Sequence, residues 1–184
     1  TKPSAEKQAK AYAEILKAAP EGPIVVRTID AGSDKPVPFL DMPHEENPAL
    51  GIRGFRLIQD HRQFLVDQLE SLEVARKETG REIWVMAPMI ATASEAIEFA
   101  EMAKSAGGYK VGIMVETPAI AMALSDLAGK LDFISVGTND LSQYLFAADR
   151  MNAGLGALLN PWQPALVRML KVIASESEKA GISS

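Results

Sequence analysis

The sequence predicts an α/β fold built on a parallel sheet, and two observations support this. Four short apolar runs rich in Val and Ile recur along the chain, at residues 23–30, 82–89, 110–117 and 132–140. Each run is continuous instead of alternating, which is typical of parallel strands buried on both faces. Segments with helical periodicity lie between these runs and after the last one. Because no linker or low-complexity stretch interrupts the order, we expect a single domain over residues 1–184.

The spacing of the apolar residues predicts the helices. Residues at i, i+4 and i+7 recur as Leu65, Leu69 and Leu72, as Ile120, Leu124 and Leu127, and as Leu166, Leu170 and Ile173. Such spacing places the three side chains of each set on one helix face. Helix start signals agree with these placements: Thr92 and Glu95 have capping-box spacing, and Pro118 and Pro164 stand where a first-turn proline is tolerated.

Composition limits the class of protein. The 184 residues are 47% hydrophobic and 23% charged with a formal net charge of -5, as in an ordinary soluble globular domain. The acidic balance and the scattered arginines argue against a nucleic-acid surface. No stretch resembles a signal-peptide core or approaches the roughly 20 apolar residues of a membrane span. The lack of cysteine excludes a disulfide framework, a thiolate metal site or a thiol nucleophile in this sequence, and fits a cytoplasmic setting.

Carboxylates follow two neighbouring strands, where parallel α/β folds bind their ligands. Glu116 and Asp140 end consecutive predicted strands, so we expect them to converge at one edge of the sheet. Two carboxylates, completed by water and substrate oxygens, are a usual way to hold Mg²⁺ beside a phosphate. The alternative is that both residues are helix caps or first-turn acids. Spacing alone leaves both interpretations open.

Arginines supply the complementary charge. Arg27 lies inside the first strand run, where an unpaired guanidinium is costly, so we expect it to reach an anion or carboxylate at the strand end. Arg53 and Arg56 have i, i+3 spacing and are predicted to share a helix face, with a solvated face as the alternative, above all for Arg56. Arg150 follows the helix that begins near Asp140. Together these residue types suggest a Mg²⁺-dependent phosphoryl-transfer site for a small phosphorylated or carboxylated ligand.

Six motifs occur in order across nearly the whole chain: "VVRTIDAGSDK", "ENPALGIRGFRL", "VMAPMI", "GIMVETPAIA", "DFISVGTNDLSQYLFAADR" and "PWQPALVRML". With them the chain resembles the C-terminal PEP-binding domain of Enzyme I, the phosphoenolpyruvate-protein phosphotransferase family of the bacterial sugar phosphotransferase system. The resemblance implies a (β/α)₈ TIM barrel with its PEP site at the carboxyl ends of the strands. The four strand-helix units match the family's third to sixth, so we expect a truncated domain that forms an open half-barrel with two unpaired edges.

The resemblance also assigns roles to individual residues. By matching motifs, Glu116 and Asp140 would be the Mg²⁺ ligands, and Asn139 would hydrogen-bond PEP. The phosphate and carboxylate of PEP would be held by Arg27, Arg53 and Arg150. In the family, the phosphoryl group passes from PEP to a histidine on a separate domain and then to a histidine phosphocarrier protein. The family further implies a cytoplasmic homodimer that serves sugar uptake, without a membrane or nucleic-acid partner.

The chain departs from the family pattern in three respects. Trp84 takes the place of a basic residue near the phosphate, so one positive contact is expected to be missing or to be supplied elsewhere. The family's proton-donor cysteine and acceptor histidine both lie outside this sequence. His44 and His61 match no motif and are interpreted as ordinary loop or helix residues. We therefore expect the chain alone to be inactive.

Two alternatives stay open: a fragment of pyruvate phosphate dikinase or PEP synthase, and a non-catalytic dimerisation module.

Overall fold

Four parallel strands form a single sheet in the computed structural model, which describes residues 2–33, 35–40, 42 and 44–184. The strands are β1 (Ile24–Arg27), β2 (Ile83–Ala87), β3 (Lys110–Val115) and β4 (Phe133–Val136). Each strand pairs in parallel with the next one along the chain. The predicted strands and their direction are confirmed, although each strand is shorter than its apolar run.

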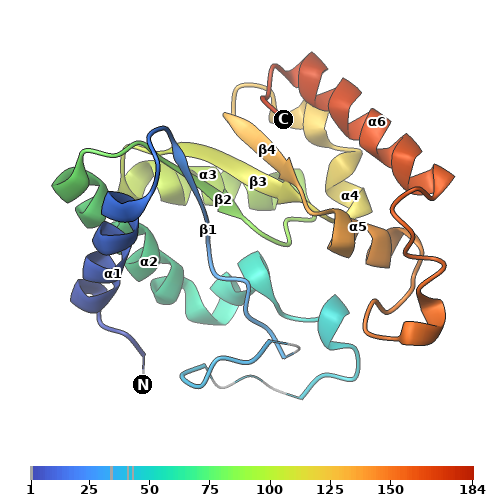
Figure 1. Cartoon of the computed structure of the whole chain (residues 1–184), viewed down its shortest axis with the longest axis horizontal. Coiled ribbons are helices and arrows are strands. Elements are labelled where there is room, and N and C mark those ends of the chain that lie inside the picture. The colour runs from blue at the N-terminus through green and yellow to red at the C-terminus, as the bar shows by residue number, and fades with distance from the viewer. Residues whose placement is uncertain (1, 34, 41, 43) are drawn as a thin grey trace.

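Helices fill the connections between the strands (Figure 1). The longer ones are α1 (Ala5–Ala18), α2 (Ile58–Thr79), α3 (Ala93–Ala106), α5 (Thr138–Leu145) and α6 (Pro164–Ala180). The shorter ones are η1 (Pro48–Leu50), η2 (Gly54–Leu57), α4 (Pro118–Ala121), η3 (Leu124–Leu127) and η4 (Ala153–Leu155). Strand and helix therefore alternate as predicted, in an open half-barrel. In the described part of the chain no helix has the length and apolar character needed to cross a membrane.

The predicted helix starts are confirmed, but one helix is broken. Thr92 and Glu95 form the capping box of α3, and Pro118 and Pro164 stand in the first turns of α4 and α6. The segment from Ile120 to Leu127 is not one continuous helix, because its hydrogen bonds shift to the i→i+3 pattern at residues 122 and 123. The side chains of Ile120, Leu124 and Leu127 are still fully buried. The periodicity thus identified the buried face correctly and the helix type incorrectly.

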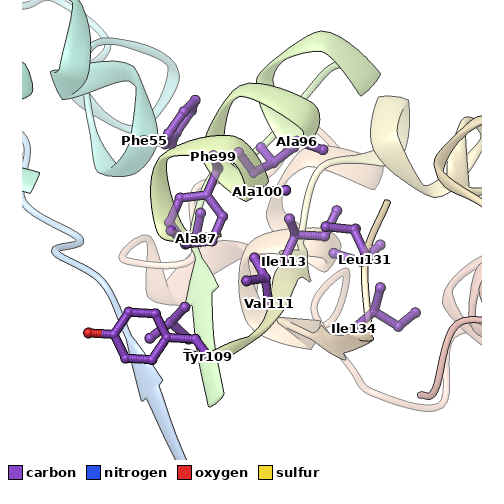
Figure 2. Packing of buried hydrophobic residues seen from close by; sticks show 14 of the residues in the cluster. Phe55, Ala87, Ala96, Phe99, Ala100, Tyr109, Val111, Ile113, Leu131 and Ile134 are labelled. Atoms are coloured by element: carbon purple, nitrogen blue, oxygen red, sulfur yellow. The ribbon is translucent and has the colours of Figure 1, made fainter. Parts of the chain in front are cut away.

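The hydrophobic core lies between the helices and one face of the sheet. Figure 2 shows Phe99 and its neighbours on α3 packed against Ala87 of β2 and Ile113 of β3. The rings of Phe55 and Phe99 meet edge to face, with centroids 5.8 Å apart. This packing fixes the strands and therefore the positions of the loops that leave their carboxyl ends.

The opposite face of the sheet is only partly covered, which corrects the prediction of strands buried on both faces. Side chains in β2 alternate between buried and half-buried, and Val25 of β1 is 48% exposed. Trp84, Met86 and Met114 are half-buried on this second face. A half-barrel leaves the inner surface of its sheet open, whereas a closed barrel fills it with side chains.

The prediction of two unpaired edges is also wrong for one edge. Ser183 forms a parallel bridge with Phe133, and the Ile134 amide donates to the Ser183 carbonyl at 2.7 Å. The residues after α6 thus begin to pair along β4. The outer edge of β1 has no partner strand in the sheet that the structure describes.

Candidate functional site

The candidate residues lie in the segments that follow the carboxyl ends of the strands. Arg27 ends β1, and Glu116 directly follows β3. Asn139 and Asp140 do not end a strand as predicted, because β4 stops at Val136 and α5 begins at Thr138. Both residues instead lie in the first turn of α5. A carboxylate is favoured there by the helix dipole, so capping and ligand roles remain compatible for Asp140.

Arg53 is the most deeply placed of the predicted residues, with a side chain only 1% exposed. It precedes η2 in extended conformation, so it does not share a helix face with Arg56 as predicted. The Arg56 guanidinium instead donates to the carbonyls of Leu50 and Gly51, at 2.9 and 3.0 Å. Arg53 Nη2 lies 3.2 Å from one oxygen of Asp30, and Nη1 lies 3.5 Å from Asp140 Oδ1. One buried guanidinium therefore joins the ends of the first and last strand segments.

The loop that carries Arg53 is fixed by its backbone. The Gly54 amide donates to the Ala31 carbonyl at 2.9 Å, and the Phe55 amide donates to the Pro88 carbonyl at 3.2 Å. Gly54 has φ +57, and a Cβ there would lie 2.9 Å from the Met89 side chain. Glycine therefore permits both the left-handed turn and the close approach of the two loops.

Asp30 is a site residue that the sequence did not single out. Its carboxylate is 4% exposed and lies 2.8 Å from Lys35 Nζ, 3.2 Å from Arg53 Nη2 and 3.6 Å from Arg27 Nη1. Burial alone would raise the pKa of Asp30, but the Lys35 hydrogen bond and the charges of Arg53, Lys35 and Arg27 hold it below its ordinary value. Arg27 thus has the carboxylate partner that its strand position predicted. Lys35, also missed, adds another cation to the site.

Glu116 is held in an acidic and desolvated environment. Its Oε1 accepts a hydrogen bond of 2.7 Å from the Met89 amide, and Met89 itself has a φ of 60. Burial raises the pKa of Glu116 to about 7; the Met89 hydrogen bond opposes this, and the charges of Asp140 and Asp30 add to it. The segment that leads into α5 comes close to this carboxylate, since a Cβ at Gly137 would lie 2.6 Å from Glu116 Oε2, so the ends of β3 and β4 converge at one edge of the sheet.

Asp140 contacts a second arginine. Its Oδ1 lies 3.0 Å from Arg150 Nη1. The Arg150 backbone amide donates a hydrogen bond of 2.9 Å to Oε1 of the buried Gln143 side chain, and this bond fixes the position of Arg150. Between Gln143 and Arg150 in the sequence lies Ala147, which has a positive φ of 49. The chain therefore turns back after α5, and this turn places Arg150 beside Asp140.

The remaining predicted residues lie elsewhere or at the margin. Asn139 is exposed in the first turn of α5. Trp84 lies toward the amino end of β2, where its Nε1 donates to Glu82 at 2.8 Å and its ring lies under the Lys110 ammonium. This placement corrects the expectation that Trp84 stands near the phosphate, because the candidate ligands follow the opposite ends of the strands. His61 lies within α2 but has non-helical dihedrals (φ -128, ψ 32) and marks a kink in that helix, which corrects its interpretation as an ordinary helix residue.

A hollow of about 690 Å³ adjoins the charged cluster. Its walls come from residues 46–50 and residues 143–144 and 147–151, with Lys35 also on its lining. Arg150 therefore stands between the buried carboxylate of Asp140 and an open space that can admit a ligand. Within the described ranges, no group of three or more acidic or histidine side chains is arranged to hold a metal.

The fold and the cluster together define a class of protein: a parallel α/β domain with arginines and buried carboxylates gathered at the carboxyl edge of its sheet, where such folds bind their ligands. The whole chain, residues 1–184, matches the family described as "PEP-utilising enzyme, PEP-binding domain". The chain belongs to this family.

Relatives with the same domain carry consistent names. The chain is 44% identical over 182 residues to the phosphoenolpyruvate-protein phosphotransferase of Streptomyces coelicolor, covering 98% of this chain and 33% of that protein. It is 37% identical to the protein of the same name from Bacillus subtilis, covering 97% and 33%. It is 36% identical to the "phosphoenolpyruvate-dependent phosphotransferase system" protein of Salmonella typhimurium, covering 98% and 25%. The chain thus spans a quarter to a third of the length of these relatives.

Proposed function

We propose that the chain binds phosphoenolpyruvate with Mg²⁺ and is the PEP-binding part of Enzyme I, a phosphoenolpyruvate-protein phosphotransferase. The observation that carries the proposal is the buried Arg53 guanidinium between Asp30 and Asp140, with Arg27 and Arg150 at either end of the same cluster. Planar guanidinium groups match the oxygens of phosphates and carboxylates, and PEP carries one of each. The family and the names of the relatives support the same ligand.

Each predicted residue takes a role in this proposal. Arg27, Arg53 and Arg150 hold the phosphate and carboxylate of PEP, and the Asn139 amide donates a hydrogen bond to it. The half-exposed side chains of Arg27 and Arg150 suit a ligand that enters from solvent, because their charge is reached without opening the core. Arg53, which is buried, supplies a charge that is not weakened by water.

The residues at the site fit Mg²⁺. Glu116 and Asp140 would supply two oxygen ligands, which is the usual protein share when phosphate and water complete the shell. A Cβ at Gly137 would lie 2.6 Å from Glu116 Oε2, so the glycine keeps open the space that this carboxylate uses beside the start of α5. Burial raises the pKa of Glu116 and the charges of Asp140 and Asp30 add to it, and a bound divalent cation would oppose both effects by favouring the ionised carboxylate. Bound Mg²⁺ would neutralise charge on the phosphate.

The proposed reaction is phosphoryl transfer by positioning and charge neutralisation. The bond between phosphorus and the enol oxygen of PEP breaks, and a bond forms to a histidine nitrogen on another domain. The phosphoryl group then moves to a histidine phosphocarrier protein, and the enolate takes up a proton to give pyruvate. This chain would bind and orient PEP, and we expect no turnover from it alone.

The wider setting is part of the same proposal. We infer a cytoplasmic homodimer that serves sugar uptake, supported by the Enzyme I resemblance and by the words "phosphotransferase system" in the name of one relative. Sedimentation of the chain with and without PEP and Mg²⁺ tests the dimer. A single monomeric species at all concentrations under both conditions would contradict it.

A titration with PEP in the presence and absence of Mg²⁺ tests the ligand. We expect PEP with Mg²⁺ to shift the backbone amide resonances of residues 138–140 and the side-chain resonances of Arg53 and Arg150. Asp140→Asn should remove the dependence on Mg²⁺, because it removes a proposed ligand. Glu176→Gln, which changes a half-buried carboxylate paired with Lys179 on α6, is the matched control. Unchanged spectra of the wild-type chain at millimolar PEP and Mg²⁺ would overturn the proposal.

A further inference from the structure

Asp30 is a buried carboxylate with no role in the ligand set described above. It follows β1, and its side chain is 4% exposed. The partners of its two oxygens are cations from three places: Arg27 at the end of β1, Lys35 in the following loop and Arg53 before η2. A buried carboxylate is stable only when paired, and this one is paired with more positive charge than it needs for its own neutralisation.

The backbone around Asp30 is anchored without the Asp30 side chain. The Thr28 amide donates to the Met86 carbonyl at 2.9 Å, and the Ile29 amide donates to Gln68 Oε1 at 3.1 Å. On the other side, Ala31 accepts from the Gly54 amide at 2.9 Å. Main-chain bonds thus hold the loop on both sides of residue 30. The Asp30 carboxylate is therefore not needed to hold the loop, and its contacts serve to position the neighbouring cationic side chains.

The cations around Asp30 need such an organiser. The side chains of Arg27 and Lys35 are 43% and 39% exposed, and long exposed cations lose rotamer freedom when they are fixed. If a carboxylate already holds these two cations beside Arg53 in the ligand-free chain, part of their conformational entropy is lost on folding. Less entropy is then lost when the ligand binds. Affinity for an incoming anion rises when the groups that receive it are already in place.

We propose that Asp30 is a positioning residue, which holds Arg27, Lys35 and Arg53 together as the receptor for the phosphate of the ligand. The inference rests on the proposed function, since it takes the ligand to be PEP. In the alternative role, the Asp30 carboxylate competes with the ligand for Arg27, Lys35 and Arg53. The two roles predict opposite effects on affinity when the Asp30 charge is removed.

The experiment compares Asp30→Asn with the matched control Glu73→Gln in the full chain. Glu73 is also a nearly buried carboxylate with Arg76 and Lys77 as partners, but it lies on α2. PEP with Mg²⁺ and inorganic phosphate are titrated by calorimetry. We expect Asp30→Asn to weaken binding of both by about tenfold, as for the loss of a charge-assisted network, and Glu73→Gln to leave both affinities unchanged. The side-chain NH resonances of Arg53 should broaden in ligand-free Asp30→Asn, which a purely structural role for residue 30 would not produce in a folded chain.

A measurement on the wild-type chain covers the case in which Asp30→Asn does not fold. The carboxyl carbon resonance of Asp30 should shift on addition of inorganic phosphate, and that of Glu73 should not. Unchanged or tighter phosphate binding by folded Asp30→Asn, or an unmoved Asp30 resonance in wild-type chain that binds phosphate, overturns the positioning role alone. Failure of the wild-type chain to bind PEP with Mg²⁺ overturns the proposed function, and the positioning role for PEP with it.

Discussion

Two clusters of arginine and buried carboxylate lie in different parts of this molecule and are built in different ways. Around Glu73, Arg76 Nε lies at 2.7 Å and Lys77 Nζ at 3.4 Å, both on the same helix, and the Gly108 amide donates at 3.2 Å. Around Arg53, the partners come from the segments after β1 and β4. The first cluster follows from i, i+3 and i, i+4 spacing on one helix. The second exists only after the sheet has formed.

The two clusters also shift the pKa of their glutamates in opposite directions. The Arg76 hydrogen bond, despite the cost of burial, lowers the pKa of Glu73. Burial, despite the Met89 hydrogen bond, raises the pKa of Glu116. A carboxylate whose pKa is lowered by its partners is typical of a structural ion pair, whereas a carboxylate whose pKa is raised by burial in a charged cluster is a candidate functional group.

The largest expected effect is that of Arg53→Met. Removal of this guanidinium leaves Asp30 and Asp140 buried with fewer counter-charges, so we expect the free energy of unfolding to fall by about 3–5 kcal/mol, as for a broken buried ion pair. PEP binding should be lost as well. Urea denaturation and calorimetry measure the two effects.

Arg76→Met is the matched control for Arg53→Met. Its side chain is 29% exposed, so the loss should be about 1 kcal/mol, within the range of exposed pairs, with PEP binding intact. If Arg53→Met and Arg76→Met lowered the free energy of unfolding by the same amount, the greater burial of Arg53 would not make its ion pairs more important for stability.

Opposite pH dependences are the next effect. Because the pKa of Glu116 is raised in the folded chain, its contribution to stability is full below about pH 4.5 and is lost as pH rises to about 7. The shift corresponds to roughly 3 kcal/mol in the ligand-free chain. Because the pKa of Glu73 is lowered, its contribution is present above its ordinary pKa and is lost as the pH falls through its folded value. Urea midpoints are measured for wild type, Glu116→Gln and Glu73→Gln from about pH 3 to about pH 8, which spans ordinary and raised carboxyl pKa values. The series separates the contribution of Glu116 from that of Glu73.

In Glu116→Gln, the urea midpoint should no longer fall as the pH rises toward 7. In Glu73→Gln, the part of the acid-induced loss of stability that is due to Glu73 should disappear. Added Mg²⁺ should restore stability near neutral pH in wild type and in Glu73→Gln but not in Glu116→Gln, because the metal favours the ionised form of a carboxylate that binds it. A neutral-side fall that persists in Glu116→Gln would assign it to another group.

The same difference explains how much the sequence could predict. Continuous apolar runs and i, i+4, i+7 spacing are local, and they identified the strands and the buried faces of α2 and α6. The helix α1 was missed, although Ala9, Ala13 and Leu16 have the same spacing and are buried. Local patterns also set the capping box at Thr92. These features need no knowledge of distant residues.

The site was predictable only in part, because its contacts are not local. The motif resemblance and the strand ends selected Arg27, Glu116 and Asp140, but helical spacing wrongly grouped Arg53 with Arg56. The sequence places Asp30 at the end of a run predicted to be buried, but its ion pair with Arg53 depends on an approach across 23 positions of the chain, which no local pattern indicates. Long-range pairing of this kind follows from the folded sheet and not from the spacing of neighbours.

A smaller effect is expected at Gly137, which lies against the site glutamate. A Cβ at this position would stand 2.6 Å from Glu116 Oε2 and 3.1 Å from Met114 Cγ, so Gly137→Ala must displace the carboxylate. We expect Mg²⁺ affinity, followed by calorimetry with PEP present, to fall about tenfold, as when a ligand's supporting shell is altered. Unchanged affinity would indicate that Glu116 does not bind the metal from this position.

The smallest effect is expected at Gly107, which lies against the other glutamate in the same way. A Cβ there would stand 2.3 Å from Glu73 Oε2 and 2.9 Å from the Tyr109 ring. Glu73 is nearly buried, but its carboxylate is the end of a flexible side chain whose partners Arg76 and Lys77 are 29% and 71% exposed, so it can shift together with them. Gly107→Ala should therefore lower the free energy of unfolding by about 1 kcal/mol, a typical single-substitution value, and leave PEP and Mg²⁺ binding unchanged. Weaker PEP binding in this variant would mean that the two clusters are coupled through α2 and the sheet, because no direct contact with the site would account for it.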